Sequence, residues 1–372
     1  MIRLLGDCIV SPLGFSSREN FNAVKIGQSS IREEDGAVSR IDRSLLSRCF
    51  NSTGAISGDY TPLEQAMIYA AFHAVKQSGI DASSPRTIFI ISTTKGNVEL
   101  LGEPGHPYGP QRIYLWHTAR LVSDFFKNPN KPFVVSNACI SGSCAQITAK
   151  RLMERRLYDY AVVVGGDMLS EFIVSGFQSF QSLSPVRCRP FDAGRKGLNL
   201  GEAGAAMVYG RHEENDHVPG LYLTAGAIRN DANHISGPSR TGEGLYLALE
   251  EVLEQTGRDS LAFINAHGTA TLYNDQMEAV SLSRSGLLAI PVNSLKAYLG
   301  HTLGAAGVVE SILSLMALNE GIVLPSLGYD THGVTEKINV ITQCMPTTGN
   351  RFVKMLSGFG GCNAVLLFEK KV

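Results

Sequence analysis

The sequence of 372 residues predicts an α/β fold built from two duplicated halves. Two observations lead to this prediction. Short runs of apolar, often β-branched residues alternate with longer helical patterns along the chain, which is typical of sheets covered by helices. The order of these elements before about residue 215 is also repeated after it, although the two halves share little sequence identity. We therefore assign residues 1–214 to an N-terminal half and residues 215–372 to a C-terminal half.

In the N-terminal half, strand-like runs follow helical patterns in a regular order. We expect helices over 62–79, 112–126 and 141–156, and strands over 87–92, 133–136, 160–165 and 205–209. The strands are recognised by runs such as Thr-Ile-Phe-Ile-Ile-Ser, which favour the extended conformation.

The C-terminal half has the same succession of patterns. We expect helices over 243–256, 276–283 and 304–319, and strands over 261–265, 290–294, 352–356 and 364–368. The helix over 304–319 is apolar on nearly every side, so it should be buried between layers. Its place in this half matches that of the helix over 141–156 in the other half.

Composition limits the classes of function that remain. A chain of this length can bury a sizeable core, as one large domain or two closely packed ones. A net charge of -1 and the lack of a basic run argue against nucleic acid as a partner, although Arg151, Arg155 and Arg156 could form a local patch for an acidic protein.

No apolar run approaches the roughly 20 residues of a membrane span, and no signal peptide is evident. Seven cysteines without metal-type or disulfide-like spacing indicate a reducing cytoplasm.

Cys139 is the first candidate for chemistry. It lies where the predicted strand over 133–136 gives way to small residues and then to a helix. Unpaired backbone N–H groups and the dipole at a helix N-terminus favour the thiolate, which is the nucleophilic form. Taken alone, a cysteine among small residues is more often an ordinary core residue.

Two histidines have comparable settings. His267 and His301 each follow a strand-like run and are surrounded by glycine, threonine and alanine. Either one alone would usually be a hydrogen-bonded core residue. Because the carboxyl ends of neighbouring strands meet at one edge of a sheet, we expect both rings and the Cys139 thiol to converge on one pocket.

Several short motifs connect these residues to a known family. In chain order they are Asn-Ala-Cys-Ile-Ser-Gly at 137–142, Arg-Pro-Phe-Asp at 189–192, Gly-Glu-Ala-Gly at 201–204, Asn-Ala-His-Gly-Thr at 265–269, Lys at 296, Gly-His at 300–301, Gly-Ala-Ala-Gly at 304–307 and Gly-Phe-Gly-Gly-Cys-Asn at 358–363. On these motifs the chain resembles a β-ketoacyl-acyl-carrier-protein synthase of the elongating type, in the thiolase superfamily. The resemblance implies a thiolase-like five-layered α-β-α-β-α fold.

The resemblance also implies an activity, which is the decarboxylative Claisen condensation of an acyl chain with a malonyl unit. Cys139 would carry the acyl chain, and the backbone N–H groups of Cys139 and Phe359 would form the oxyanion hole. His267 and His301 would stabilise the enolate that forms when carbon dioxide leaves. Initiating synthases of the family have asparagine in place of the second histidine, so His301 favours elongation.

Four further positions receive supporting roles from the resemblance. Lys296 would form an ion pair with Glu310, and this pair would set the charge of the pocket. The alternative is that Lys296 is an ordinary surface lysine. Thr269 and Thr271 would bind the pantetheine arm, unless they are ordinary strand-end threonines. Phe359 would also line the acyl pocket and act as its gate, although a loop aromatic that merely packs is a serious alternative. No metal or cofactor is expected, since the substrates are carried on the phosphopantetheine of an acyl carrier protein.

Partners and alternatives remain open at this point. We expect a dimer through the apolar strand over 133–136 and the helix over 112–126. Relative to the family, the region 95–132 looks compressed, which leaves open both the acyl length and whether the partner is a second copy or a related subunit. The main alternative function is a non-catalytic, chain-length-setting subunit, which Cys139 and both histidines oppose. A degradative thiolase would require a Cys-x-Gly motif near the C-terminus, and residues 362–364 do not supply it.

Overall fold

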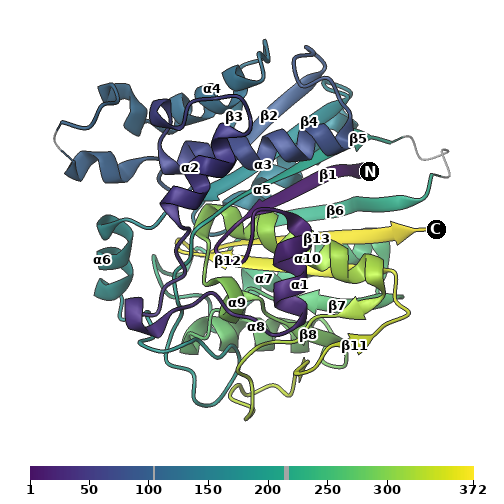
Figure 1. The fold of residues 1–372 in the computed structure, drawn as a ribbon. Helices are drawn as coiled ribbons and strands as arrows, with labels where there is room; N and C mark the ends of the chain where they lie inside the picture. The colour runs from purple at the N-terminus through teal and green to yellow at the C-terminus, as the bar shows by residue number, and fades with distance from the viewer. Residues whose placement is uncertain (104, 213–217) are drawn as a thin grey trace.

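The computed structural model describes residues 1–103, 105–212 and 218–372. Within these ranges the fold is mixed α/β with one large sheet (Figure 1). The boundary that we expect between residues 214 and 215 lies outside the described residues.

The two halves contribute strands in the same spatial order. The first half supplies β1 (Ile2–Val10), β2 (Thr87–Ser92), β3 (Phe133–Val135), β4 (Tyr160–Asp167) and β5 (Ala203–Arg211), arranged as β3-β2-β4-β5-β1. The second half supplies β6 (Gly220–Asn230), β7 (Leu261–Asn265), β8 (Pro291–Asn293), β12 (Arg351–Gly358) and β13 (Cys362–Lys371), arranged as β8-β7-β12-β13-β6. Numbered within each half, both orders are third, second, fourth, fifth and first. The repeated order of elements in the sequence therefore corresponds to a repeated topology.

Hydrogen bonding joins these strands into a single 11-stranded sheet. The junction is short, since β1 and β6 pair only at Ile2 with Leu223 and at Arg3 with Tyr222. A small strand, β10 (Asn339–Val340), extends the sheet beyond β8, and β9 (Ile322–Val323) pairs with β11 (Met345–Pro346) as a separate ribbon.

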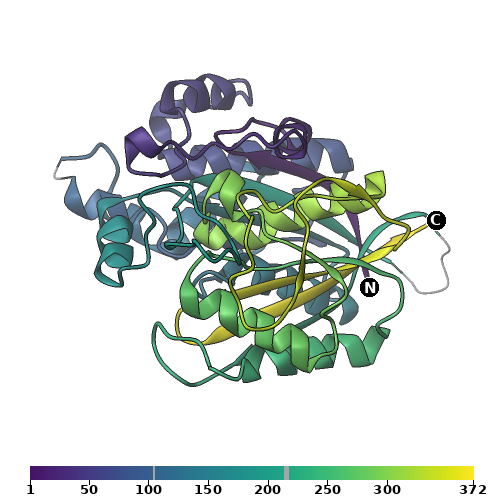
Figure 2. The ribbon, with the colours of Figure 1, turned by 90° about the horizontal axis from the view of Figure 1, so that it is seen from below.

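Helices divide the structure into five layers. On one side, α3 (Pro62–Ser78) covers β1, β4 and β5, and on the other, α7 (Glu243–Thr256) covers β6 and β13, with α8 (Leu272–Arg284) packed against α7. Between the two halves of the sheet lie α5 (Ser141–Glu154) and α10 (Ala306–Glu320), which contact strands of both halves. Figure 2 shows these layers from below. The five-layered fold and the burial of the helix over 304–319 are confirmed.

The two central helices approach each other backbone to backbone. A side chain at Gly307 would place its Cβ 2.4 Å from the Ser143 nitrogen, and one at Gly142 would place its Cβ 3.0 Å from the Gly304 oxygen. Only glycine permits contact at this distance. The contact brings the N-terminal end of α5, next to Cys139, against the N-terminal end of α10, next to His301.

Several elements differ from the expectations. The strands β1 and β6 were not predicted, because β1 carries Gly6 and Asp7 and has a register shift against β5, while β6 contains small residues that give little strand signal. The helix expected over 112–126 is instead the 3₁₀ turn η4 (Pro110–Ile113) followed by α4 (Leu115–Phe125). The helix expected over 276–283 begins earlier, at Leu272.

The remaining helices are short. They are α1 (Ser17–Lys25), α2 (Arg43–Asn51), α6 (Glu171–Ser179) and α9 (Lys296–Leu299), with 3₁₀ turns η1 (Glu33–Asp35), η2 (Ser57–Asp59), η3 (Val98–Gly102) and η5 (Leu303–Ala305). Among the described residues, Leu303–Glu320 is the one helical segment that is long and apolar enough to cross a membrane, and 83% of it is buried inside the protein. It is therefore accounted for as a core helix.

Candidate active site

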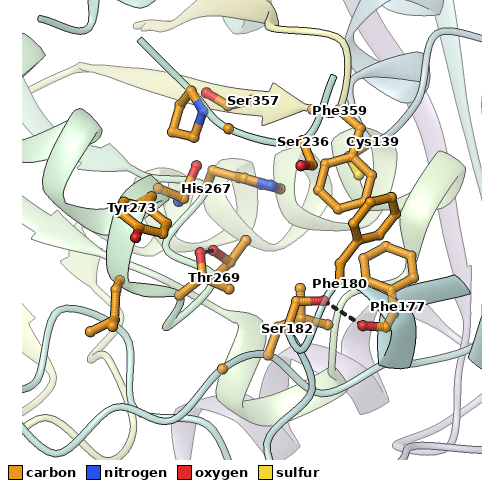
Figure 3. A pocket seen from close by; sticks show the side chains of 18 of the residues that line it. Cys139, Phe177, Phe180, Ser182, Ser236, His267, Thr269, Tyr273, Ser357 and Phe359 are labelled. Atoms are coloured by element: carbon orange, nitrogen blue, oxygen red, sulfur yellow. Dashed lines mark hydrogen bonds between the residues drawn. The ribbon is translucent and has the colours of Figure 1, made fainter. Parts of the chain in front are cut away.

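Three side chains that the sequence singled out meet in one cavity. Cys139 follows β3, His267 follows β7, and His301 lies between α9 and η5. The Cys139 sulfur and a ring nitrogen from each histidine all lie within 4.8 Å of one another, and the two rings are 5.1 Å apart between centroids at 81°. All three line a cavity of about 500 Å³, and Figure 3 shows Cys139 and His267 facing it. The predicted convergence is confirmed.

A backbone feature accompanies each of the three residues. Ala138, Ala270 and Leu303 have φ angles of 45°, 61° and 51°, which place three non-glycine residues in the left-handed region. Such conformations cost of order 1 kcal/mol each and are held only where the surrounding structure requires them. The sequence gives no sign of this strain, because alanine and leucine carry no signal for a left-handed turn.

The electrostatics of Cys139 correct one expectation. The thiol was expected to favour the thiolate because a helix begins close by, at Ser141. Instead, burial raises the pKa of Cys139 to about 12, with the neighbouring Cys362 acting in the same direction and Lys296 opposing it. Desolvation outweighs the helix terminus, so the resting side chain is a neutral thiol that must lose its proton to react.

The backbone beside the thiol has the arrangement expected of an oxyanion hole. The Phe359 N–H is directed at the Cys139 sulfur and lowers the pKa of the thiol. At the end of β12, a Cβ on Gly358 would lie 3.1 Å from the Cys139 nitrogen, so the absence of a side chain there allows the two backbones to meet. The backbones of Cys139 and Phe359 are therefore close together, and the oxyanion hole that the resemblance implies stays a prediction.

Both histidines are held in the neutral form. Burial, followed by the positive charge of Lys296, places the pKa of each ring well below its usual value. The Nδ1 atom of His301 accepts the Leu303 N–H at 3.4 Å, which assigns the ring proton to Nε2. That Nε2 is buried and has no protein partner among the described residues. A neutral ring with an unused N–H group is suited to donating a hydrogen bond to a bound oxygen.

Two carboxylates hold the loop that carries His267. Glu278 accepts the N–H groups of His267 and Gly268, both at 2.7 Å, and Asp275 accepts that of Ala270 at 3.1 Å. Both carboxyl groups are fully buried, and burial raises the pKa of Asp275 to about 6 and that of Glu278 to about 7. They act on the loop backbone and not on the cavity.

Beneath the histidines lies a buried charged group of three residues. Lys296 pairs with one oxygen of Glu310, as predicted, and Lys354 on β12 pairs with the other at 2.5 Å. Both lysine side chains are completely buried. Lys354 was not predicted as a site residue, although a lysine inside the apolar run at 352–356 is visible in the sequence.

The remaining predicted residues also line the cavity. The hydroxyls of Thr269 and Thr271 lie 2.8 Å apart and both residues line the cavity. The ring of Phe359 packs against those of Phe177 and Phe180, with centroids 5.4 Å and 5.1 Å away (Figure 3). These three rings form an aromatic wall next to Cys139.

A metal ion has one candidate location in the described part of the chain. There, the set of three histidine, cysteine or carboxylate side chains close enough to share an ion is Cys139, His267 and His301. The positive charge of Lys296, which acts on all three groups, opposes a divalent cation at this position.

Comparison with known proteins agrees with the motifs. The family model described as the N-terminal domain of beta-ketoacyl synthase matches residues 25–215, and the model of its C-terminal domain matches residues 222–330. The 3-oxoacyl-[acyl-carrier-protein] synthase 2 of Rhizobium meliloti is 29% identical over 418 aligned residues, which cover 99% of this chain and 98% of the relative. A putative mitochondrial 3-oxoacyl-[acyl-carrier-protein] synthase of Schizosaccharomyces pombe is 31% identical over 260 residues, covering 63% of this chain and 60% of that protein.

Solved structures share the fold over nearly the whole chain. The ketosynthase ApeO of Xenorhabdus doucetiae, solved in complex with its chain length factor ApeC, aligns with a TM-score of 0.86 at 24% identity and covers 99% of this chain and 98% of that chain. A beta-ketoacyl synthase from Burkholderia phymatum aligns with a TM-score of 0.86 at 23% identity and 99% coverage of both chains.

Proposed function

The chain belongs to the β-ketoacyl synthase family, and from this premise we propose that it is an active β-ketoacyl-carrier-protein synthase that works through Cys139, His267 and His301. The observation that carries the proposal is the convergence of one thiol and two neutral imidazoles within 4.8 Å, at the base of a cavity of about 500 Å³. The reaction joins an acyl group to a malonyl unit, with loss of carbon dioxide.

The first half-reaction loads Cys139. The sulfur attacks the thioester carbonyl of an acyl carrier protein, and the N–H groups of Cys139 and Phe359 bind the oxyanion that forms. The pantetheine thiol leaves with a proton, and the acyl group stays on the sulfur. Because burial raises the pKa of Cys139 to about 12, the thiol proton must pass to a nearby acceptor; the neutral ring of His267 can receive it and pass it on to the leaving pantetheine sulfur.

The second half-reaction uses the histidines as hydrogen-bond donors. The thioester oxygen of the malonyl group binds against His267 and His301, and the carboxylate leaves as carbon dioxide. The resulting enolate oxygen is held by the two ring N–H groups, and the enolate carbon attacks the Cys139 thioester. A donor of this kind is typically worth about 3 kcal/mol of barrier. The Cys139 sulfur is expelled as a thiolate and takes up one proton from solvent to regenerate the thiol, and the β-ketoacyl carrier protein is released.

The carrier arm would enter through the mouth of the cavity. Thr269 and Thr271 line this entrance and present hydroxyls that can bind the amides of a pantetheine arm. Arg151, Arg155 and Arg156 are exposed, but they lie at the end of α5 opposite Cys139 and do not line the cavity, so they give this entrance no basic surface. No metal or cofactor takes part in the proposed reaction.

A partner subunit is part of the proposal. The strand β3 lies at one end of the sheet, with Phe133 41% exposed, and the stacked rings of Tyr114 and Trp116 on the neighbouring segment are 52% and 53% exposed. An apolar edge strand of this kind is suited to pairing with another chain. We propose a homodimer or, as in the solved complex of ApeO with its chain length factor, a pair with a related subunit. The seven free thiols support a cytoplasmic location.

The second candidate function, a non-catalytic chain-length-setting subunit, draws on the same solved complex. The complete set of Cys139, His267 and His301 favours the catalytic one.

The test uses the purified chain with acyl- and malonyl-carrier proteins, and mass spectrometry of the carrier-bound product. A β-ketoacyl product that depends on Cys139 supports the proposal. Cys139→Gln, whose side chain imitates an acylated thiol, should decarboxylate malonyl-carrier protein faster than the unaltered chain without condensing it. Absence of both activities, in the isolated chain and in one co-expressed with a partner, contradicts the proposal.

A further inference from the structure

Lys354 occupies a position where a lysine is costly. It lies in the middle of β12, between two core residues, and its side chain has no exposed surface. Burying an ammonium group is unfavourable unless it is paired and hydrogen-bonded. The ammonium has three acceptors: Glu310 at 2.5 Å, the Met355 carbonyl at 3.0 Å and the Ala266 carbonyl at 3.3 Å.

One of these acceptors, the Ala266 carbonyl, connects Lys354 to the active site. Ala266 immediately precedes His267, so the ammonium of Lys354 binds the carbonyl oxygen of the peptide group that joins these two residues. The register of β12 against β7 explains why the Lys354 side chain reaches the Ala266 carbonyl, because Lys354 pairs with Asn265, the residue before Ala266. On the other side of the same loop, Glu278 accepts the His267 N–H at 2.7 Å. His267 is thus anchored by an ammonium on one side and a carboxylate on the other.

The charges around the histidines do not balance within the group. Lys296 and Lys354 share the single carboxylate of Glu310, which leaves one surplus positive charge when both lysines are protonated. Burial lowers the pKa of Lys354 to about 8, so at neutral pH most of the protein carries this charge. Cys139 lies within 4.8 Å of both rings, and Arg195, Lys196 and His234 line the same cavity. The carboxylates of Asp167, Asp275 and Glu278 bind backbone N–H groups of the loops that carry the histidines. Asp167 is already paired with Lys95 at 2.9 Å. Burial leaves the pKa of Glu278 raised to about 7, so this carboxyl group offsets only part of the surplus.

We propose that Lys354 is a positioning residue for the decarboxylation half-reaction, which orients His267 through the Ala266 carbonyl and supplies the surplus positive charge beneath both histidines. This proposal rests on the proposed function. The surplus charge resists protonation of the rings, so both can donate at neutral pH, and it stabilises the negative charge that moves onto the thioester oxygen as carbon dioxide leaves. Lys354 contributes to the positive charge that lowers the pKa of both rings, in agreement with this role.

The test separates orientation from charge. It is performed in the Cys139→Gln background, where malonyl decarboxylation is measured without condensation. Lys354→Met removes both contributions and should lower kcat by about tenfold or more with little change in KM. It should also move the acid limb of the pH profile to higher pH, because rings that lose a neighbouring positive charge are protonated more easily.

A double variant restores the surplus positive charge but not the hydrogen bond from Lys354 to the Ala266 carbonyl. Combining Lys354→Met with Glu310→Gln leaves Lys296 as the single positive charge of the group, so the net charge is again that of the unaltered protein. We expect the acid limb to return toward its original position while kcat stays low. Because the double variant replaces a buried ion pair by neutral groups, it also provides a measurement if Lys354→Met alone does not fold.

The matched control is Val353→Ala, which opens a small cavity at the next position of the same strand, on its opposite face. It should lower the thermal midpoint without moving the acid limb. If Lys354→Met behaves like this control in both kcat and pH profile, the role of Lys354 is structural and the proposal is wrong. If the Cys139→Gln protein itself shows no malonyl decarboxylation, the proposed function fails instead.

Discussion

The two halves of this protein have the same strand order, yet they hold their reactive groups by different means. Cys139, in the first half, is held by backbone geometry: a left-handed Ala138 in its own half, and from the second half the close approach of Gly358 and the N–H group of Phe359. The second half presents His267 and His301 through buried charge, from Lys296, Lys354 and the carboxylates that bind the surrounding backbone. A duplicated fold therefore does not imply duplicated chemistry.

The difference has a physical reason. A thiol needs an oxyanion hole beside it, which backbone N–H groups can supply without any charged side chain. Imidazole rings that must stay neutral and donate hydrogen bonds are kept so by burial and, to a lesser extent, by nearby positive charge, which here comes from the side chains of Lys296 and Lys354.

Removal of the nucleophile should have the largest effect. Cys139→Ala is expected to lower condensation by at least about 10³-fold, since no other thiol occupies the same place in the cavity. The fold should persist because the surrounding turn consists of small residues, so the thermal midpoint should change little. Acylation measured by mass spectrometry checks the assignment, and near-normal turnover, or acylation of Cys144 in its place, would contradict it.

Removal of either histidine should separate the two half-reactions. His267→Ala or His301→Ala is expected to lower malonyl decarboxylation by about 10²–10³-fold while part of the Cys139 acylation remains, because the proposed oxyanion hole consists of backbone N–H groups and not of the histidine rings. Stopped-flow measurement of each step distinguishes them. Equal and mild losses in both steps would mean that the histidines are structural.

The pH dependence of Cys139 alkylation tests the buried thiol. With the pKa of Cys139 raised to about 12, the thiolate fraction in the folded protein should still be increasing at pH 10. An unfolded thiol titrates near 8.5, so alkylation at pH 8 should be at least about tenfold slower in the folded chain. The measurement is the iodoacetamide rate for the Cys139 peptide by mass spectrometry. A plateau near pH 7 would instead indicate a thiolate paired with a protonated histidine.

A substitution between the central helices should affect both halves at once. Gly307→Ala places a Cβ 2.4 Å from the Ser143 nitrogen, so it should reduce the free energy of unfolding by about 1–3 kcal/mol and weaken both half-reactions. Chemical denaturation gives the first quantity. The control is Gly176→Ala in α6, where a Cβ meets nothing within 4 Å and helix propensity improves. Unchanged stability in Gly307→Ala would show that the crossing is not tight.

The smallest effect is expected at the cavity mouth. Thr271→Val keeps the shape of the side chain but removes the hydroxyl that lies 2.8 Å from that of Thr269. The KM for malonyl-carrier protein should increase by a few fold with kcat unchanged, which corresponds to one neutral hydrogen bond. Steady-state kinetics with carrier-bound substrate measures both parameters. A decrease in kcat without a change in KM would mean that Thr271 does not bind the pantetheine arm.

Much of the fold and site was predictable from local patterns. The alternation of helices and strands, the buried helix over 304–319 and the convergence of Cys139, His267 and His301 all follow from periodicity and motif order. Strands whose signal is weakened by glycine and polar residues, β1 and β6, were missed, although they join the two halves. Lys354 was missed for a related reason, since a single lysine in an apolar run does not reveal which carboxylate it will meet.

The sequence by itself determined which side chains are available for chemistry and the order in which strands and helices occur, because both depend on residues close together along the chain. Tertiary structure alone decided the protonation state of Cys139, the sharing of Glu310 between two lysines and the left-handed turns beside each reactive residue. These properties depend on burial and on contacts between distant segments, such as the 88 residues that separate Ala266 from Lys354. Burial reverses the effect that the helix terminus alone would have on the thiol, and it is established only when the five layers pack together.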